Sequence, residues 1–449
     1  NGRIALANSG TTSDVTLTGD VATTASGLAD STAAIAIDSH RHLFANAVNL
    51  TTAGSGAIRL DATGTANLLA TDICCNSGFT RDLNAAGDVL ITATTITRST
   101  DDLMQVQGKA VSLVASGSIG PVGDLTARSG NLLVQAGTAA GDSIDFSGRT
   151  LTATVGDLAL QAGGNIAVSR LTAAGAVVVN SAAGAIITNA LVDGASVSLS
   201  AANGLDLAAL TTTAGRLSLV NTGAGADIIL RGDLTASNAG LLPTDLAVDL
   251  ASGRDIRFNA VNVAAVGSGG IRIDAARTFD AVATDICCNA GFVRTLSAPG
   301  DISIHATAGA ITRSADDILN ISGRNLALTA GTSFTPIGNL TANGAGADIA
   351  VTAGTTLSTA GIAIAAPDSI ALTAAGSLTT GNLTTTTGSI QLTSTAADIS
   401  TGLLAAGADI TLNGLAGVTA GPLTAGTAGQ GRIAITASGA GSNIVATGD

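Results

Sequence analysis

The sequence predicts an all-β protein, a parallel β-helix in which short strands stack coil upon coil. Three observations support this prediction. Apolar residues alternate with Thr, Ser or Ala over three to five residues, these segments recur about every 20 residues, and Gly, Asn or Asp stands between them. Alternation with a period of two is typical of strands and not of helices. The helix formers Glu and Lys are almost missing, since the chain has no Glu and Lys109 is its only Lys.

The alternating segments follow a solenoid period. In the second half, successive segments begin 20 to 24 residues apart, at Ile302, Leu326, Ile349, Ile370, Ile390, Ile410 and Ile433. The first half continues the pattern, with segments beginning at Ile35, Ile58, Val89, Val111, Leu132, Leu158, Val177, Val197 and Leu217. We therefore expect an elongated rod of about 20 coils of 19 to 31 residues. Each strand would pair with its equivalent one coil up, at a spacing of about 4.8 Å.

A Gly-Asp step stands before several of these segments, and we interpret it as a corner that leads into a strand. The steps are at residues 19–20, 87–88, 156–157, 232–233 and 300–301. Inward Ile, Val and Leu would stack in ladders, Ala would fill the tight corners, and Gly and Asn would tolerate positive φ at the bends. Most aspartates are therefore expected to be turn formers.

A longer repeat lies above the coil repeat. Copies are offset by 213 residues near the start and by 215 after a two-residue insertion, as in "SDVTLTGD" (13–20) and "ADIILRGD" (226–233), or "ITRSTDD" (96–102) and "ITRSADD" (311–317). We predict one superrepeat at 1–213, a second at 214–429 and the start of a third at 430–449. Each would advance about 48 Å. Because the chain starts and stops inside the pattern, we expect a longer natural protein or subunits stacked end to end, and in either case a fibre.

Composition excludes several classes of protein. A net charge of −13 argues against nucleic acid and anionic lipid as partners. The apolar runs are too short for a membrane-spanning helix, and 46% hydrophobic residues with 11% charged is opposite to the composition of disordered chains. The chain begins at Asn1 without a secretion signal, so we expect a mature product or an internal segment.

All four cysteines occur as two adjacent pairs, in "TDICCNSGF" (71–79) and "TDICCNAGF" (284–292). They are Cys74, Cys75, Cys287 and Cys288. Each pair lies in a coil about ten residues longer than usual, so we expect an excursion that carries a disulfide between neighbours, through a strained ring. Free buried thiols and a bond between fibres are the alternatives. Adjacent cysteines lack the spacing that holds zinc, and their presence favours an oxidising, extracellular setting.

The sequence offers little for catalysis, and we expect no catalytic residue, cofactor or metal. The strongest enzyme hypothesis is a surface site of clustered carboxylates and arginines, where one carboxylate could act as acid and another as base. Its residues are Arg98, Asp101, Asp102, Arg313, Asp316 and Asp317. Adjacent aspartates share a face only if they lie in a loop. A structural turn is the competing interpretation. His40 and His42 become Gly253 and Asp255 one superrepeat later, so we interpret them as surface histidines.

Several strings resemble the shaft repeats of the filamentous haemagglutinin-like adhesins, bacterial exoproteins exported by two-partner secretion. They include "GDISIHATAGAITRS" (300–314), "DSIALTAAGSLTTGNLTTTTGSIQLTS" (368–394) and "GADITLNGLAGVTAGPLTAG" (407–426). The likeness is one of repeat style and covers essentially the whole chain. It implies a right-handed β-helical fibre outside the cell that serves adhesion, aggregation or matrix building. The cysteine pair is not a hallmark of that family.

We therefore expect a non-enzymatic structural or adhesive rod of an extracellular bacterial filament. Its partners would be further copies or the rest of a longer chain, with surface glycans or neighbouring cells as possible targets. A β-helix that binds or degrades polysaccharide is one alternative, and a passive stalk that displays a distal toxin or binding tip is another. Two identical candidate sites about 48 Å apart, without aromatic residues for sugar stacking, favour the first hypothesis.

Overall fold

The computed structural model describes residues 2–70, 79–284 and 292–447, and within these ranges the chain is all-β with no helix. The strands are grouped in two compact units, Asn1–Thr213 and Ala214–Asp449. The boundary falls at the residue where the sequence places the border between superrepeats, and residues 430–449 belong to the second unit. Within the described residues, no helix has the length and apolar character needed to cross a membrane.

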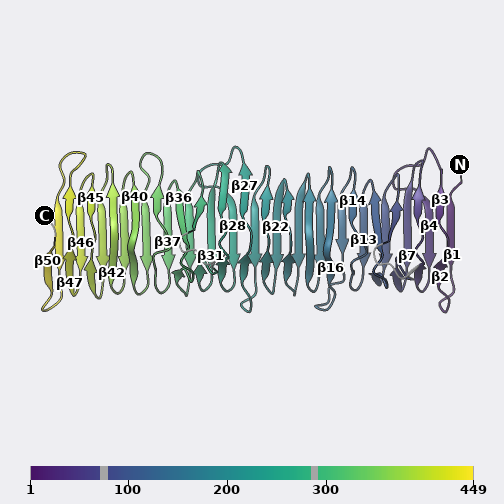
Figure 1. Ribbon diagram of the computed structural model, residues 1–449, viewed down its shortest axis with the longest axis horizontal. Helices are drawn as coiled ribbons and strands as arrows, with labels where there is room; N and C mark the ends of the chain where they lie inside the picture. Colours follow the sequence, from purple (N-terminus) through teal and green to yellow (C-terminus); the bar gives the residue numbers. More distant parts are fainter. Residues whose placement is uncertain (1, 71–78, 285–291, 448–449) are drawn as a thin grey trace. The chain divides into compact units, whose positions relative to one another are not determined.

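Each unit is a β-solenoid of stacked strands (Figure 1). By their pairing along the coils, we group the strands into three parallel sheets, here called A, B and C. Sheet A of the first unit contains β1 (Ile4–Asn8), β4 (Ala33–Ser39), β7 (Ala57–Ala62), β10 (Val89–Ala93), β13 (Val111–Ala115), β15 (Leu132–Gln135), β17 (Leu158–Ala162), β19 (Ala176–Ser181) and β22 (Ser196–Ala201). Sheet A of the second unit contains β25 (Leu217–Asn221), β28 (Leu246–Ser252), β31 (Gly270–Ala275), β34 (Ile302–Ala306), β37 (Leu326–Ala330), β39 (Ile349–Ala353), β41 (Ile370–Ala374), β43 (Ile390–Ser394), β46 (Ile410–Gly414) and β49 (Ile433–Ala437).

Sheets B and C are built from shorter strands. In the first unit, sheet B contains β2 (Val15–Leu17), β5 (Leu43–Ala45), β8 (Thr65–Asn67), β11 (Thr95–Thr97), the first parts of β16 (Ile144–Ala153) and β18 (Ile166–Ala173), β20 (Ile186–Thr188) and β23 (Leu205–Leu207). Sheet C contains β3 (Val21–Thr23), β6 (Leu50–Thr52), β9 (Thr80–Asn84), β12 (Leu103–Gly108), β14 (Leu125–Ala127), the second parts of β16 and β18, β21 (Val192–Gly194) and β24 (Leu210–Thr212).

The second unit repeats this plan. Its sheet B contains β26 (Ile228–Leu230), β29 (Ile256–Phe258), β32 (Phe279–Asp280), β35 (Ile311–Thr312), the first parts of β40 (Leu357–Ala366) and β42 (Leu378–Thr385), β44 (Asp398–Ser400), β47 (Gly417–Ala420) and β50 (Asn443–Ala446). Its sheet C contains β27 (Leu234–Asn238), β30 (Val263–Gly267), β33 (Val293–Ser297), β36 (Ile318–Gly323), β38 (Leu340–Ala342), the second parts of β40 and β42, β45 (Leu404–Ala406) and β48 (Leu423–Ala425).

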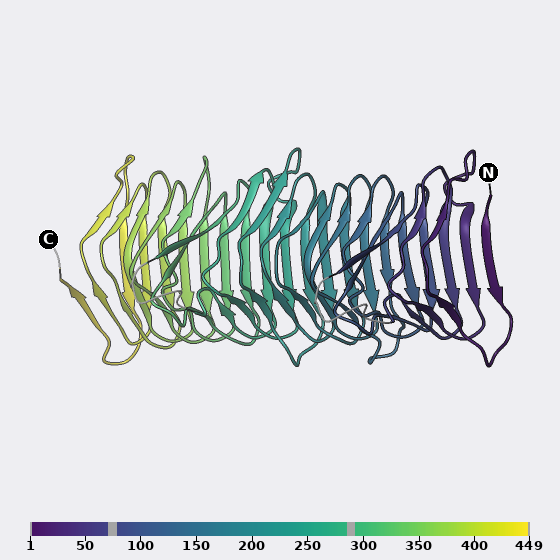
Figure 2. The same ribbon diagram turned by 45° about the vertical axis from the view of Figure 1, so that its right-hand side comes forward.

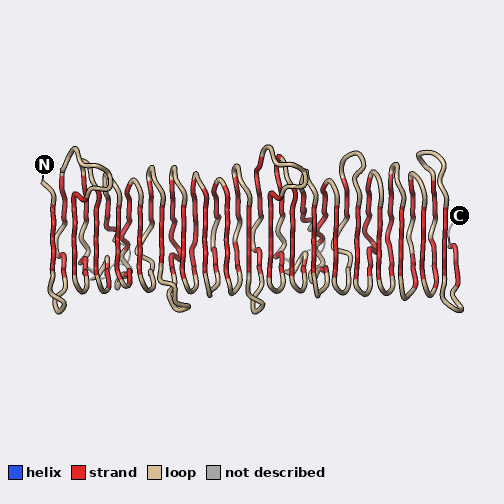
Figure 3. The backbone as a smooth tube through the Cα atoms, turned by 180° about the vertical axis from the view of Figure 1, so that it is seen from behind, coloured by secondary structure: helices blue, strands red, loops and turns tan. Residues whose placement is uncertain are grey.

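Strand pairing confirms the predicted parallel β-helix. Within each unit, every sheet A strand pairs in parallel with the equivalent strand of the next coil, as in Val89 with Val111 and Val111 with Leu132. Figures 2 and 3 show these strands side by side, with loops at the coil corners. The apolar segments found in the sequence all lie in sheet A. Parallel strands joined by a crossover almost always connect with a right hand, which agrees with the right-handed helix expected.

The core of each unit is a set of apolar ladders. Ile35, Ile58, Leu132 and Leu158 are fully buried, and register-paired neighbours bring such residues together coil after coil. Alternate residues of each strand face outward, as the burial pattern of β10 shows. The period of two in the sequence therefore corresponds directly to the inner and outer faces of the sheets.

The Gly-Asp steps mark corners, as predicted, and each aspartate also bonds to the next coil. All five lie immediately before a strand, and in each case a carboxylate oxygen accepts a backbone N–H one coil further on, at 2.8 to 3.3 Å. The carboxylates are those of Asp20, Asp88, Asp157, Asp233 and Asp301, and the N–H groups belong to Asn49, Ala110, Ala176, Asn262 and Asn325. A short acceptor side chain at the corner thus satisfies a donor that the strand ladder leaves free.

Candidate functional site

The first Arg-Asp-Asp motif forms a closed turn. Arg98 Nη1 donates hydrogen bonds to the backbone carbonyl oxygens of Asp101 and Asp102, at 2.9 and 2.5 Å. Burial lowers the pKa of Arg98 from its ordinary value, the positive charge of Arg149 adds to this effect, and the two aspartates oppose it. The guanidinium of Arg98 therefore closes the turn by binding backbone carbonyl oxygens and not the aspartate carboxylates.

The second motif has the same geometry. Arg313 Nη1 donates to the carbonyl oxygens of Asp316 and Asp317, at 2.7 and 2.9 Å. Asp317 is fully buried, whereas Asp316 is exposed. In the first unit, Asp102 is likewise fully buried and Asp101 is exposed. The structure therefore does not bring the two carboxylates of either motif to one face, and the predicted surface site would have only one carboxylate of each pair at the surface.

A groove of the first unit lies elsewhere, on sheet A. It has a volume of about 790 Å³ and crosses the ends of β1, β4, β7, β10 and β13. Its polar lining includes Asp38, Asp61, Arg59 and His40. Asp38 and Asp61 are register partners on neighbouring strands, and Arg59 donates from Nε to Asp61 at 2.5 Å. In this groove, charged side chains of both signs line an open cavity.

A counterpart of this groove lies in the second unit, with a volume of about 410 Å³. It keeps Asp274, the equivalent of Asp61, but has Ala251 and Gly253 in place of Asp38 and His40. Arg272, the equivalent of Arg59, donates two hydrogen bonds to Asp249, at 2.9 and 2.7 Å. These bonds raise the pKa of Arg272 above its ordinary value. The second groove is therefore smaller, and Arg272, unlike Arg59, is not part of its lining but is paired with Asp249 and Asp274.

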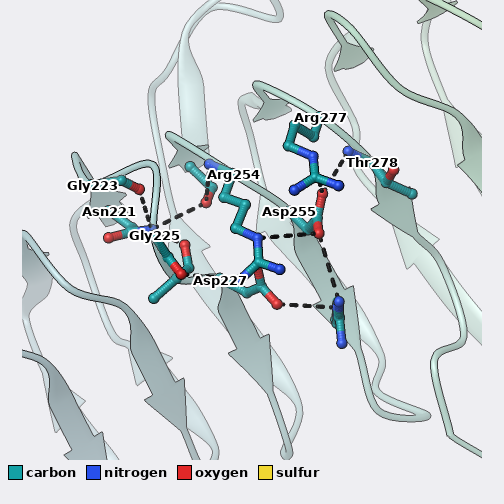
Figure 4. Close-up of polar contacts among 11 residues, drawn as sticks. Asn221, Gly223, Gly225, Asp227, Arg254, Asp255, Arg277 and Thr278 are labelled. Carbon is teal, nitrogen blue, oxygen red and sulfur yellow. Dashed lines mark hydrogen bonds and ion pairs between the residues drawn. The ribbon is translucent and has the colours of Figure 1, made fainter.

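A dense charge cluster belongs to the second unit (Figure 4). Arg254 and Arg257 approach Asp227 through Nε at 3.4 and 3.2 Å. Both also approach Asp255, as does Arg277, at 3.6 to 3.8 Å. The side chains of the two aspartates are only 8 to 9% exposed, whereas those of the three arginines are 32 to 59% exposed. The arginines thus cover the carboxylates from the solvent side.

This cluster joins successive coils. Asp227 directly precedes β26, and Asp255 directly precedes β29, which pairs with β26. Asp255 also accepts the backbone N–H of Thr278, next to β32, at 2.9 Å. A small polar cavity of about 290 Å³ lies beside Asp255, Arg257 and Thr278. Because each carboxylate is already neutralised by arginines, the arrangement is suited to holding coils together and poorly suited to proton transfer.

The first unit has different chemistry at the same place. His42 and Phe44 replace Asp255 and Arg257, and their rings lie 6.0 Å apart. His42 Nδ1 accepts the backbone N–H of Thr65 at 2.9 Å, the bond that Asp255 makes in the second unit. The sequence interpretation of His42 as a surface residue is therefore incomplete, because its ring bridges two coils. The recurrence of acceptors at the coil period is the signal that could have revealed both the histidine and the cluster.

Cys74, Cys75, Cys287 and Cys288 lie outside the described residues. His40 is exposed and its Nδ1 lies 3.1 Å from the carbonyl oxygen of Asn8. In the ranges that the structure describes, no group of three or more His, Cys, Asp or Glu side chains could hold a metal ion.

Fold and site together define a β-solenoid in which many charged side chains link one coil to the next. No protein-family model, no curated protein and no solved structure matches the chain. The function must therefore be argued from the molecule itself.

Proposed function

We propose that this chain is a non-enzymatic structural or adhesive segment of an extracellular bacterial filament, built from tandem β-helical superrepeats. One observation carries the proposal: the two units share several hydrogen bonds that join coils, and they do not share the chemistry of their grooves. Further copies, or further superrepeats of the same chain, are its main partners. The resemblance to adhesin shafts agrees with this role.

The shared contacts are numerous and closely matched. Asp102 and Asp317 are both fully buried and accept backbone N–H groups at 3.0 and 2.9 Å. Asn49 and Asn262 both bond to the aspartate one coil earlier, Asp20 or Asp233, through backbone N–H and side-chain amide. Contacts that stabilise a coil have thus been kept in both copies.

The groove residues, by contrast, have diverged. Asp38 and His40 in the first unit correspond to Ala251 and Gly253 in the second. A reaction that needed these groups would run in one copy only, whereas a rod needs every coil equally. Divergence of groove chemistry beside retention of coil contacts is the pattern expected of a repeat protein whose role is mechanical or adhesive.

A second candidate function is glycan binding in the groove of the first unit. The specific observation is the cavity of about 790 Å³ lined by Asp38, Asp61, Arg59 and His40. Carboxylates and an arginine can bond to sugar hydroxyls, and the volume lies within the range of ligand pockets. A passive stalk for a distal tip remains compatible with the same architecture.

Electron micrographs of the native material test the main proposal. Nine sheet A strands, β1 to β22, precede β25, the equivalent of β1, so a superrepeat has nine coils and not the ten that an advance of about 48 Å assumes. We therefore expect long unbranched fibres with an axial repeat of about 43 Å. Compact single particles in the native material would contradict it.

A depolymerisation assay on a panel of neutral and acidic polysaccharides tests the enzymatic alternative. We expect no product from the wild type. Activity that disappears in Asp101→Ala with Asp316→Ala, or in Asp38→Ala, would replace the structural proposal by an enzymatic one.

A further inference from the structure

The outward face of sheet A in the second unit carries two regular ladders. Consecutive strands place Thr329, Thr352, Thr373 and Thr393 in one row. The row beside it holds Ala327, Ala350, Ala371 and Gln391. Both rows point away from the core, because alternate residues of these strands are buried and exposed or half-buried. The register has no bulge from β37 to β49.

This face is also free of charge. No Asp, Lys, Arg or His occurs in β37, β39, β41, β43, β46 or β49. The aspartates of this region lie at the corners instead, for example Asp348 directly before β39 and Asp409 directly before β46. In the first unit, β10, β13, β15, β17, β19 and β22 lack charged residues in the same way.

We infer that the uncharged outward face of sheet A in the second unit, from β37 to β49, is a lateral docking surface for a second copy of this chain; the inference deepens the proposed assembly of further copies and rests on it. The chain has a net charge of −13, so two copies repel each other through their charged corners. An uncharged face is where they can approach with the least repulsion.

Small side chains in ladders favour this partner over an unrelated protein. Sheets whose outer rows hold Ala and Thr can pack closely face to face, about 10 Å apart. Because the rows repeat at every coil, the face of one copy matches that of another when the two are shifted by whole coils. A face made of repeats is thus complementary to itself, the condition for a symmetric interface.

The area available predicts a weak pair. Six strands of five residues cover roughly 29 by 16 Å, so two docked faces from one unit would bury about 900 Å². A stable interface needs about 1,000 Å² or more. Docking through these six strands alone is therefore marginal. Association should become prominent only at high concentration or in long fibres.

Sedimentation velocity of the full chain over a range of concentrations tests this inference. The wild type should associate, and more strongly at higher salt, because salt screens the repulsion between negative chains. Thr373→Asp and Thr373→Lys should each weaken association by about tenfold or more, since the added charge would lie between two uncharged faces and lose its water. An equimolar mixture of the two variants should regain association, because opposite charges then meet. Unchanged thermal unfolding would show that both variants are folded.

Thr384→Asp is the matched control, since Thr384 is an exposed outward threonine on the sheet C part of β42. It should associate like the wild type. A wild type that stays monomeric at all concentrations and salt levels would overturn the inference. An equal loss in Thr384→Asp, or no recovery in the mixture, would also overturn it.

Discussion

Asp317 and Phe292 are joined by a hydrogen bond in which a fully buried carboxylate oxygen, Oδ1, accepts the backbone N–H of Phe292 at 2.9 Å. Oδ2 of Asp317 is buried and has no hydrogen-bond partner among the described residues. Removing this acceptor would leave the N–H of Phe292 without its partner. We therefore expect Asp317→Ala to lower the free energy of unfolding by about 1–3 kcal/mol, measured by urea denaturation.

The neighbouring exposed residue provides the control for this prediction. Asp316→Ala should change stability by no more than about 0.5 kcal/mol, because its carboxylate is exposed. Asp317→Asn keeps an acceptor oxygen and should lose less stability than Asp317→Ala. Equal stability of Asp317→Ala and Asp316→Ala would show that the buried hydrogen bond contributes nothing.

The Asp301–Arg324 pair should make stability depend on acidity. Arg324 donates two hydrogen bonds to the carboxylate of Asp301, at 2.7 and 2.6 Å, which hold the pKa of Asp301 below its ordinary value of 3.8. A carboxyl whose pKa is lower in the folded state contributes stability above the unfolded pKa and loses it as pH falls through the folded pKa. The stability advantage of the wild type over Arg324→Gln should therefore be constant above about pH 4 and shrink below it.

Urea denaturation midpoints at a series of pH values measure this effect. In an Asp301→Asn background the carboxyl is absent, so Arg324→Gln should produce no pH-dependent difference there. An advantage of the wild type that persists unchanged down to about pH 2 would contradict the proposed linkage.

Gly54 lies where the backbone of the preceding coil leaves no room for a side chain. A Cβ at Gly54 would overlap the carbonyl oxygen of Ala25, and Gly267 makes the same close approach to Asn238 in the second unit. Gly54→Ala should therefore cost on the order of 1–3 kcal/mol of stability, measured by thermal unfolding. Gly19→Ala is the control. A Cβ at Gly19 would have no atom within 4 Å, so this substitution should leave stability nearly unchanged. Comparable unfolding of both variants would refute the steric explanation.

Phe279 and Phe258 form an edge-to-face pair in the core of the second unit, with ring centroids 5.0 Å apart. Phe279→Ala should cost about 3–5 kcal/mol in urea denaturation, although the first unit has Ala66 at this place. The first unit tolerates Ala66 because it has the larger Leu68 in its core, whereas the second unit has Ala281 at the position of Leu68. The double variant Phe279→Ala/Ala281→Leu should recover part of the loss. A single variant as stable as the wild type would mean that the core relaxes fully around the cavity.

The periodic features of the fold could be predicted because each depends on local chemistry. Alternation of Ile, Val and Leu with small polar residues sets the inner and outer faces of a strand, and Gly-Asp sets a corner. The geometry of the Arg-Asp-Asp motif could not be predicted in the same way. Asp101 and Asp102 are adjacent in sequence, yet Asp101 is exposed and Asp102 is buried. Nothing in the motif itself says which carboxylate faces the core.

The sequence by itself determined the coil period, the superrepeat and the sheet A strands, since all three follow from the spacing of apolar residues and turn formers along one chain. Only the tertiary structure decided what the charged residues do. Asp227, Asp255 and Arg277 are far apart in sequence and meet because stacking superposes one coil on the next. The repeated "NAVN" segments were visible as a motif, but only the backbone shows that Ala47 and Ala260 adopt positive φ, of 48° and 52°. Contacts between coils depend on three-dimensional register, which no single stretch of sequence contains.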